Sequence, residues 1–297
     1  MMNWILLTLF AVMIWAVGNI VEKFVLTKYF KNPAIPTFFS CLFGLIAALI
    51  TYTFAHVAFP ALEVAFVPFI AGVMFMVLVY SYFKALYMEE VSRVIPLFAL
   101  VPLFVSILAA IFLNEIFSII KYAGVAFLIA GAFVISYEKK GVFKLSKAFW
   151  TMIIADIFFA ASIVLVKYSL DTLSMTSNTT FFWFALGNFA LIPIFFFMSK
   201  KSLFKVIKKS PKVLLYVCFS EPIAITGRYV LFTAASLGPI TLISALGQTQ
   251  MFFVLLFAIA VTMLWPKIIK EKINKKEIIE KLIGITLVFI GSVLVII

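Results

Sequence analysis

Apolar runs of close to 20 residues follow one another along almost the whole chain, and they constrain its fold more than any other feature. Their approximate limits are 3–22, 36–58, 65–87, 92–113, 117–137, 148–169, 178–199, 212–236, 239–264 and 278–297. A helix rises 1.5 Å per residue, so each run can cross about 30 Å of hydrocarbon. Unpaired backbone groups are costly in lipid, which favours helices. The sequence therefore predicts an all-α integral membrane protein with ten transmembrane helices.

The composition leaves no room for a soluble domain between these runs. Of the 297 residues, 65% are hydrophobic and only 12% are charged, so we expect one membrane domain whose main surroundings are the lipid bilayer. A net charge of +12 can indicate a nucleic-acid partner. Here the lysines cluster in short connections between apolar runs, as membrane topology alone requires, so no nucleic-acid partner is expected.

The two halves of the chain resemble each other in the same order. The fifth run reads "KYAGVAFLIAGAFVI" and the tenth reads "KLIGITLVFIGSVLVI". The coinciding positions are Lys121 with Lys281, Gly124 with Gly284, Gly131 with Gly291 and, at the ends of the first and sixth runs, Lys23 with Lys167. We interpret this as a five-helix unit, residues 1–140, repeated as residues 141–297. An odd number of helices per unit inverts the second copy in the membrane. The four glycines are predicted to mark close helix contacts.

Basic residues are distributed unevenly over the predicted connections. The chain has 24 lysines and arginines. Lys121 and Lys167 lie on one face of the membrane, Arg228 lies inside the eighth run, and all the others lie on the opposite face. The positive-inside rule assigns the lysine-rich face to the cytoplasm. We therefore predict a multi-pass protein of the cell (plasma or inner) membrane with both termini extracytoplasmic.

The fourth run has a proline pattern that suggests a family. It reads "SRVIPLFALVPLFVSILAAIFLNE" from Ser92, with Pro96 and Pro102 inside it and Glu115 at its end. Together with ten helices and two repeats, this resembles the EamA-type branch of the drug/metabolite transporter superfamily. The second half departs from the family pattern, because its last connection, "TMLWPKIIKEKINKKEIIEK", is long and basic. The resemblance implies transport of small metabolites, often export of amino acids, through a central cavity lined by the third, fourth, eighth and ninth helices.

The eighth run, "YVCFSEPIAITGRYVLF", carries two charges near its middle. Glu221 and Arg228 are two helical turns apart, so they share a face and lie roughly 10 Å apart along the axis. A charge at the bilayer centre costs about 2.5 to 3.5 kcal/mol, so both should face the interior or water. They either form structural ion pairs with other helices or line a substrate path. Asp156, midway along the sixth run, is a candidate partner for Arg228 or a candidate proton acceptor, and Glu221 could also carry a coupling proton.

Other polar and aromatic side chains are weaker candidates for the substrate path. Gln248 and Gln250 are two residues apart in "ALGQTQMFF", so in one helix they cannot both face the same way. Hydroxyls or an indole at similar depth are offered by Tyr80, Tyr82, Tyr229 and Trp15, although such residues more often pack or anchor at the interface. Asn19 and Asn188 are expected to hydrogen-bond to neighbouring helices.

No metal-ligand spacing, phosphate-binding loop or nucleophile–base motif occurs in the sequence, so we expect no cofactor, no metal and no enzymatic activity. The predicted function is a secondary transporter, an exporter, that moves a small polar metabolite such as an amino acid by alternating access. A proton gradient or the substrate gradient would drive it, as a monomer or a homodimer. Two alternatives remain: a carrier or flippase of an amphiphilic or lipid-linked substrate, since there are 36 phenylalanines, and a membrane-embedded lipid-modifying enzyme.

Overall fold

The computed structural model describes residues 3–30, 32–89, 91–114, 118–136, 146–264 and 275–296. Within these ranges all regular secondary structure is helical. Glu115 and most of the basic last connection, residues 265–274, lie outside the described residues.

The helices of the first half follow the first five apolar runs. They are α1 (Asn3–Lys28), α2 (Ala34–Phe54), α3 (Leu62–Met88), the single turn α4 (Val91–Val94), the 3₁₀ helix η1 (Ile95–Leu100), α5 (Val101–Phe112) and α6 (Ile119–Ser136). Those of the second half are α7 (Lys147–Asp171), α8 (Ser177–Ala190), α9 (Ile192–Lys209), α10 (Lys212–Leu237), α11 (Ile240–Gly247), α12 (Gln250–Leu264) and α13 (Lys275–Ile296).

Several of these helices are long and apolar enough to cross a membrane. Within the described residues six such spans occur, and a seventh if α8 and α9 count as one span bent by 45°. Shorter apolar stretches cover Leu97–Phe112, Ile119–Leu128 and Leu282–Leu294. The prediction of a multi-pass, all-α membrane protein is confirmed, whereas the prediction of ten crossing helices is supported only for these six or seven.

Three predicted runs, the fourth, the seventh and the ninth, are interrupted where the backbone does not continue as an α-helix. The fourth run becomes α4, η1 and α5, and prolines occupy the first turns of both η1 and α5. A proline at position 193 likewise follows the bend between α8 and α9. Proline lacks the N–H that an α-helix needs and clashes with the preceding turn, so helices restart at these residues. The first helix shows the opposite difference, because α1 continues to Lys28, beyond the predicted end at residue 22.

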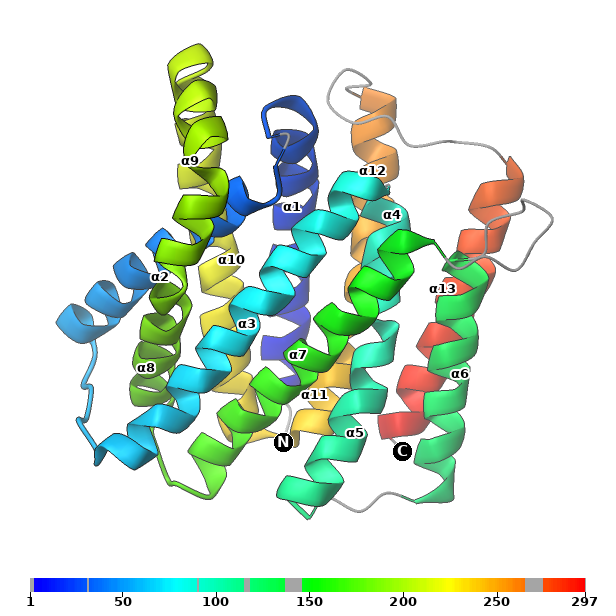
Figure 1. Ribbon diagram of the computed structural model, residues 1–297. Coiled ribbons are helices and arrows are strands. Elements are labelled where there is room, and N and C mark those ends of the chain that lie inside the picture. The colour runs from blue at the N-terminus through cyan, green and yellow to red at the C-terminus, as the bar shows by residue number, and fades with distance from the viewer. Residues whose placement is uncertain are drawn as a thin grey trace.

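Figure 1 shows the helices as one bundle with the N- and C-termini at its lower end. Large apolar side chains cover much of the outer surface, among them Phe54, Leu62, Phe197 and Leu215, each more than 70% exposed. Such a surface is stable only against lipid or another apolar partner.

Glycines let two pairs of helices approach very closely. A Cβ atom added to Gly131 would lie 2.7 Å from the carbonyl oxygen of Gly284, and one added to Gly291 would lie 2.7 Å from that of Gly124. These residues join α6 to α13, which run side by side in Figure 1. The predicted glycine contacts are thus confirmed, and the glycines of the two halves meet one another. Gly72 and Gly187 create a second close contact, between α3 and α8.

Candidate functional site

A cavity of about 130 Å³ lies in the interior of the bundle, and both halves of the chain line it. Its walls come from the third and fourth predicted helices (α3, η1 and α5) and from the eighth and ninth (α10, α11 and α12), as the family resemblance implies. Side chains of α1 and α7 and one serine of α2 complete the lining. Most of these side chains are apolar, and the polar ones are Asn19, Glu22, Ser40, Tyr82, Glu221, Arg228, Ser244, Gln248 and Gln250.

Arg228 of α10 lines the cavity and is only 8% exposed. Its guanidinium carbon lies 4.0 Å from the ring centroid of Phe75, a cation–π contact. Oriented so that its nitrogen donates to the carbonyl oxygen of Gly72, the Asn188 amide accepts a hydrogen bond from Nη1 of Arg228 at 3.1 Å. Nε of Arg228 is buried without a hydrogen-bond partner. The arginine is therefore held in place with donor capacity left over.

Glu221, on the same helix, faces the same cavity and is 7% exposed. The hydroxyl of Ser40 on α2 donates to its Oε1 at 2.6 Å. Because Glu221 stays within electrostatic reach of Arg228, each charge partly offsets the cost of burying the other. Pro222 directly follows Glu221, and α10 continues through it without interruption.

Glu22 is a second carboxylate in the cavity, which the sequence interpretation did not include among the candidates. It accepts a hydrogen bond from the hydroxyl of Tyr82 at 3.1 Å, and that hydroxyl also contacts Oδ1 of Asn19 at 3.1 Å. Glu22 is the last residue of the first predicted run, 3–22, so the run did not mark it as a charge inside the membrane. The continuation of α1 to Lys28 makes it an internal residue. The signal that could have identified it is a carboxylate followed by one more turn of apolar residues.

Trp15 also lines the cavity, and it joins α1 to α10. Its indole Nε1 donates to the carbonyl oxygen of Ala224 at 3.0 Å. A Cβ atom on Gly227 would lie 2.6 Å from that nitrogen, so only glycine at this position leaves room for the ring. The pair explains why a glycine precedes Arg228 in the sequence.

Gln248 and Gln250 both line the cavity, which corrects the expectation that they face different ways. The helix breaks between them: α11 ends at Gly247 and α12 begins at Gln250. The backbone hydrogen bonds here join residues three positions apart, as in a 3₁₀ helix. The Gln248 N–H donates to the Ala245 carbonyl and the Thr249 N–H to the Leu246 carbonyl, each at 3.1 Å. The change from α-helical to 3₁₀-like turns rotates Gln250 onto the same side as Gln248.

The remaining candidates lie outside the cavity lining. Tyr80 packs its ring against Phe195, with centroids 5.5 Å apart, and the Tyr229 hydroxyl donates to Asn178 Oδ1 at 2.7 Å. Asp156 of α7 is fully buried, and neither carboxyl oxygen has a hydrogen-bond partner, so of its two candidate roles the pair with Arg228 is not formed. Asp156 precedes Phe159, a cavity residue, by one helical turn. Among the described residues no cluster of three metal-ligating side chains occurs.

Equivalent positions of the two halves meet at the cavity. Six pairs of cavity-lining residues, one from each half, are separated by the same number of positions in the sequence. They are Phe75 with Ala224, Val79 with Arg228, Tyr82 with Leu231, Ile95 with Ser244, Phe98 with Gly247 and Val101 with Gln250. Trp15 with Phe159 and Asn19 with Ile163 do the same at the spacing that relates Lys23 to Lys167. In several of these pairs only one member is polar. The charges of the cavity therefore belong to single positions and are not repeated between the halves.

Comparison with known proteins gives the fold and a family. No curated protein matches the sequence. Several solved structures match, and one of them, described only as a crystal structure of a protein, has a TM-score of 0.61 and 16% identity, covering 99% of this chain and 98% of that one. At this identity the likeness concerns the fold alone. The model of the EamA-like transporter family matches residues 2–137. Over these residues the predicted resemblance to the EamA-type branch of the drug/metabolite transporter superfamily is confirmed.

Proposed function

We propose that the protein is a secondary transporter that moves a small polar solute across the cell membrane by alternating access. The observation that carries this proposal is the cavity between the halves, where Arg228, Glu221 and Glu22 converge inside an otherwise apolar bundle. Ionisable residues within membrane helices are costly and usually mark substrate or ion pathways. The match of residues 2–137 to a transporter family points the same way.

The proposed architecture is two inverted five-helix units, residues 1–140 and 141–297, that rock against each other around the cavity. Support comes from the paired lining positions and from the glycines of α6 and α13, which meet across the two halves. A structure built from two such units can close one mouth while the other opens.

The chemistry of the lining indicates the class of solute. One guanidinium and two carboxylates favour a solute that carries both an acidic and an amino group, such as an amino acid. The planar fork of Arg228 suits a carboxylate, and Glu221 and Glu22 suit an amine. A cavity of about 130 Å³ is small beside the roughly 300 Å³ at which pockets for drug-sized ligands begin, which favours a small metabolite.

Proton coupling is proposed to run through Glu221 or Asp156. Glu221 is bonded to one hydroxyl inside the cavity, and the Asp156 carboxyl is buried without a hydrogen-bond partner, one helical turn before the cavity residue Phe159. We propose export as the direction of net transport, and a cytoplasmic location for the lysine-rich connections with both termini outside. Figure 1 is compatible with this topology, since both termini lie at one end of the bundle.

Proteoliposome uptake tests the proposal. Purified protein is reconstituted, and uptake is measured with a panel of radiolabelled amino acids, other amines and carboxylates, with and without an imposed proton gradient. We expect uptake of at least one zwitterionic solute by the parent, its loss in Arg228→Gln, and near-parental uptake in Tyr229→Phe, a matched control outside the cavity lining. Equal uptake by the parent and Arg228→Gln would refute the role of the cavity charges. No uptake of any panel member above empty vesicles would refute the proposed substrate class.

A further inference from the structure

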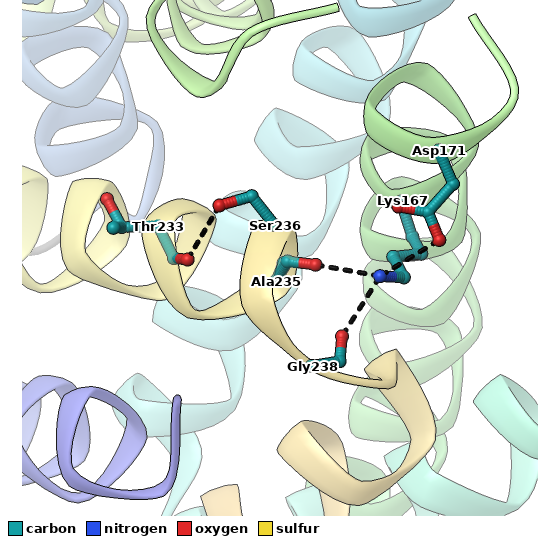
Figure 2. Close-up of polar contacts among 6 residues, drawn as sticks. All are labelled: Lys167, Asp171, Thr233, Ala235, Ser236 and Gly238. Carbon is teal, nitrogen blue, oxygen red and sulfur yellow. Dashed lines mark hydrogen bonds and ion pairs between the residues drawn. The ribbon is translucent and has the colours of Figure 1, made fainter. Parts of the chain in front are cut away.

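A buried lysine holds the end of the eighth predicted helix. Lys167 of α7 is 7% exposed, and its ammonium donates to the carbonyl oxygens of Ala235 at 2.9 Å and Gly238 at 3.0 Å. Its third partner is Oδ2 of Asp171, at 3.0 Å, one turn further along α7 (Figure 2). All three ammonium donors are therefore engaged. The two carbonyls belong to the last turn of α10 and to the residue that follows it.

The first half contains the same arrangement. Lys23 of α1, equivalent to Lys167, donates to the carbonyl oxygens of Leu86 and Glu89. These belong to the last turn of α3 and to the residue that follows it, so they correspond to Ala235 and Gly238 of α10. Carbonyls at a helix C-terminus lack intrahelical partners and carry partial negative charge, so a cation is stabilised there. In each half, the first helix thus provides a lysine that binds the C-terminal end of the third.

Each lysine acts at a connection between two cavity-lining helices. Lys23 binds where α3 leads into α4 and η1, and Lys167 binds where α10 leads into α11. Tyr82 and Ile95 line the cavity on either side of the first connection, and Leu231 and Ile240 do so on either side of the second. In Figure 1, α3 ends at the upper end of the bundle and α10 at the lower end. The two lysines therefore secure opposite ends of the cavity.

We infer that Lys23 and Lys167 are equivalent positioning residues, each of which holds its own end of the cavity closed by fixing the C-terminal end of α3 or of α10. The inference rests on the proposed alternating access. When one end opens, its lysine releases the two carbonyls, while the lysine at the other end keeps them. Asp171 supports the closed arrangement at its end, because its carboxylate holds the Lys167 ammonium against the two carbonyls from a position that is itself 52% exposed.

A helix cap that served folding alone would not distinguish the two ends of the cavity, and this difference provides the test. Val91 and Ile240 are the first residues of α4 and α11, directly after the two connections, and are 0% and 1% exposed. Val91→Cys and Ile240→Cys therefore serve as matched reporters, in a background in which the native Cys41 and Cys218 are replaced by alanine and serine. Labelling by a membrane-impermeant maleimide, present on both faces of proteoliposomes, measures how often each end opens.

We expect Lys167→Met to increase labelling of Ile240→Cys on the order of tenfold, the usual effect of losing a charged hydrogen bond, without increasing labelling of Val91→Cys. Lys23→Met should do the reverse. Lys167→Arg should restore most of the protection, since it retains a cation at the helix end. Asp171→Asn, at an exposed position, should increase labelling of Ile240→Cys alone and by less, and it tests the inference even if Lys167→Met does not fold.

Labelling that rises equally at both reporters, or at neither, in Lys23→Met and Asp171→Asn would overturn the inference. Solute uptake by the parent is measured in the same vesicles and separates the two proposals. Uptake together with unselective labelling would overturn the role of the lysines alone. Selective labelling without uptake of any panel solute would leave the two lysines as closures of the cavity and refute the proposed solute class.

Discussion

The close contact between α6 and α13 predicts that alanine at either central glycine destabilises the protein. A Cβ atom on Gly131 would lie 2.6 Å from Cγ2 of Val288 and 2.7 Å from the carbonyl oxygen of Gly284. One on Gly291 would lie 2.7 Å from the carbonyl oxygen of Gly124. Since backbone oxygens cannot rotate away, as a side chain can, the two helices would have to separate.

The size of the effect follows from two opposing terms. Alanine in place of a helical glycine favours the helix by about 1 kcal/mol. Overpacking a close contact costs about 1 to 3 kcal/mol, so the net change is a destabilisation of up to about 2 kcal/mol. Leucine, which is larger, should cost more. The double variant should cost less than the sum of the single ones, because both substitutions demand the same separation of α6 and α13.

Thermal melting in detergent measures this effect, and the chain offers a matched control. A Cβ atom on Gly18 meets only Cγ2 of Ile223, at an ordinary 3.5 Å. Gly18→Ala should therefore melt at or slightly above the parental temperature, while Gly131→Ala and Gly291→Ala melt below it. If all three alanine variants melt alike, the glycines are not required for the contact and the reasoning fails.

Three further predictions concern the cavity and the topology. Arg228→Lys keeps the charge but loses the planar fork, so the apparent KM for a carboxylate-bearing solute should rise about tenfold in uptake assays, with insertion unchanged. Ser40→Ala removes the hydrogen bond to Glu221 Oε1, and uptake of an amine-bearing solute should fall by about three- to tenfold, which an unchanged rate would contradict. A reporter enzyme fused after Ile297 should be active only outside the cytoplasm, and cytoplasmic activity would overturn the orientation.

The sequence predicted most of the helices because their signals are local. Hydrophobic runs of membrane length identify spans wherever they occur, and the glycine pattern of the fifth and tenth runs correctly located a close contact between them. The membrane itself enforces this part of the fold, since each span must satisfy its backbone hydrogen bonds internally. The helix breaks were less predictable. Proline accompanies two of them, but the break between Gln248 and Gln250 contains no proline.

The cavity was harder to predict because it depends on which helices meet. Arg228 and Glu221 are conspicuous in an apolar run, but Ser40, which fixes Glu221, lies in α2 amid an unremarkable stretch. The candidate partner for Arg228 was Asp156, because of its charge and its position midway along the sixth run. The contacts observed are a phenylalanine ring and an amide, on α3 and α8. Cation–π contacts and amide bonds carry no charge signature, so a single sequence does not reveal them.

Residues shared by the two halves differ in role from polar residues that occur in only one half. Features present in both halves, such as the glycines of α6 and α13 and the lysines at the helix ends, hold the bundle together. Polar cavity residues present in only one half have apolar counterparts in the other: Val79 corresponds to Arg228, and Val101 to Gln250. An equivalent backbone position therefore tolerates valine, and the polar residue is retained for what it contacts in the cavity.

Substitutions at two adjacent residues, Glu22 and Lys23, should shift the melting temperature in opposite directions. The counterpart of Glu22 is Val166, whereas the counterpart of Lys23 is Lys167. Glu22→Val removes a carboxylate that is costly to keep inside a membrane helix and lies within electrostatic reach of the Glu221 carboxylate. The Tyr82 hydroxyl still has Asn19 as a partner. This variant should melt at or above the parental temperature and lose uptake of amine-bearing solutes. Lys23→Met leaves two helix-end carbonyls without their cation and should melt lower. If the two variants shift the melting temperature in the same direction, the division into shared architecture and half-specific chemistry is wrong.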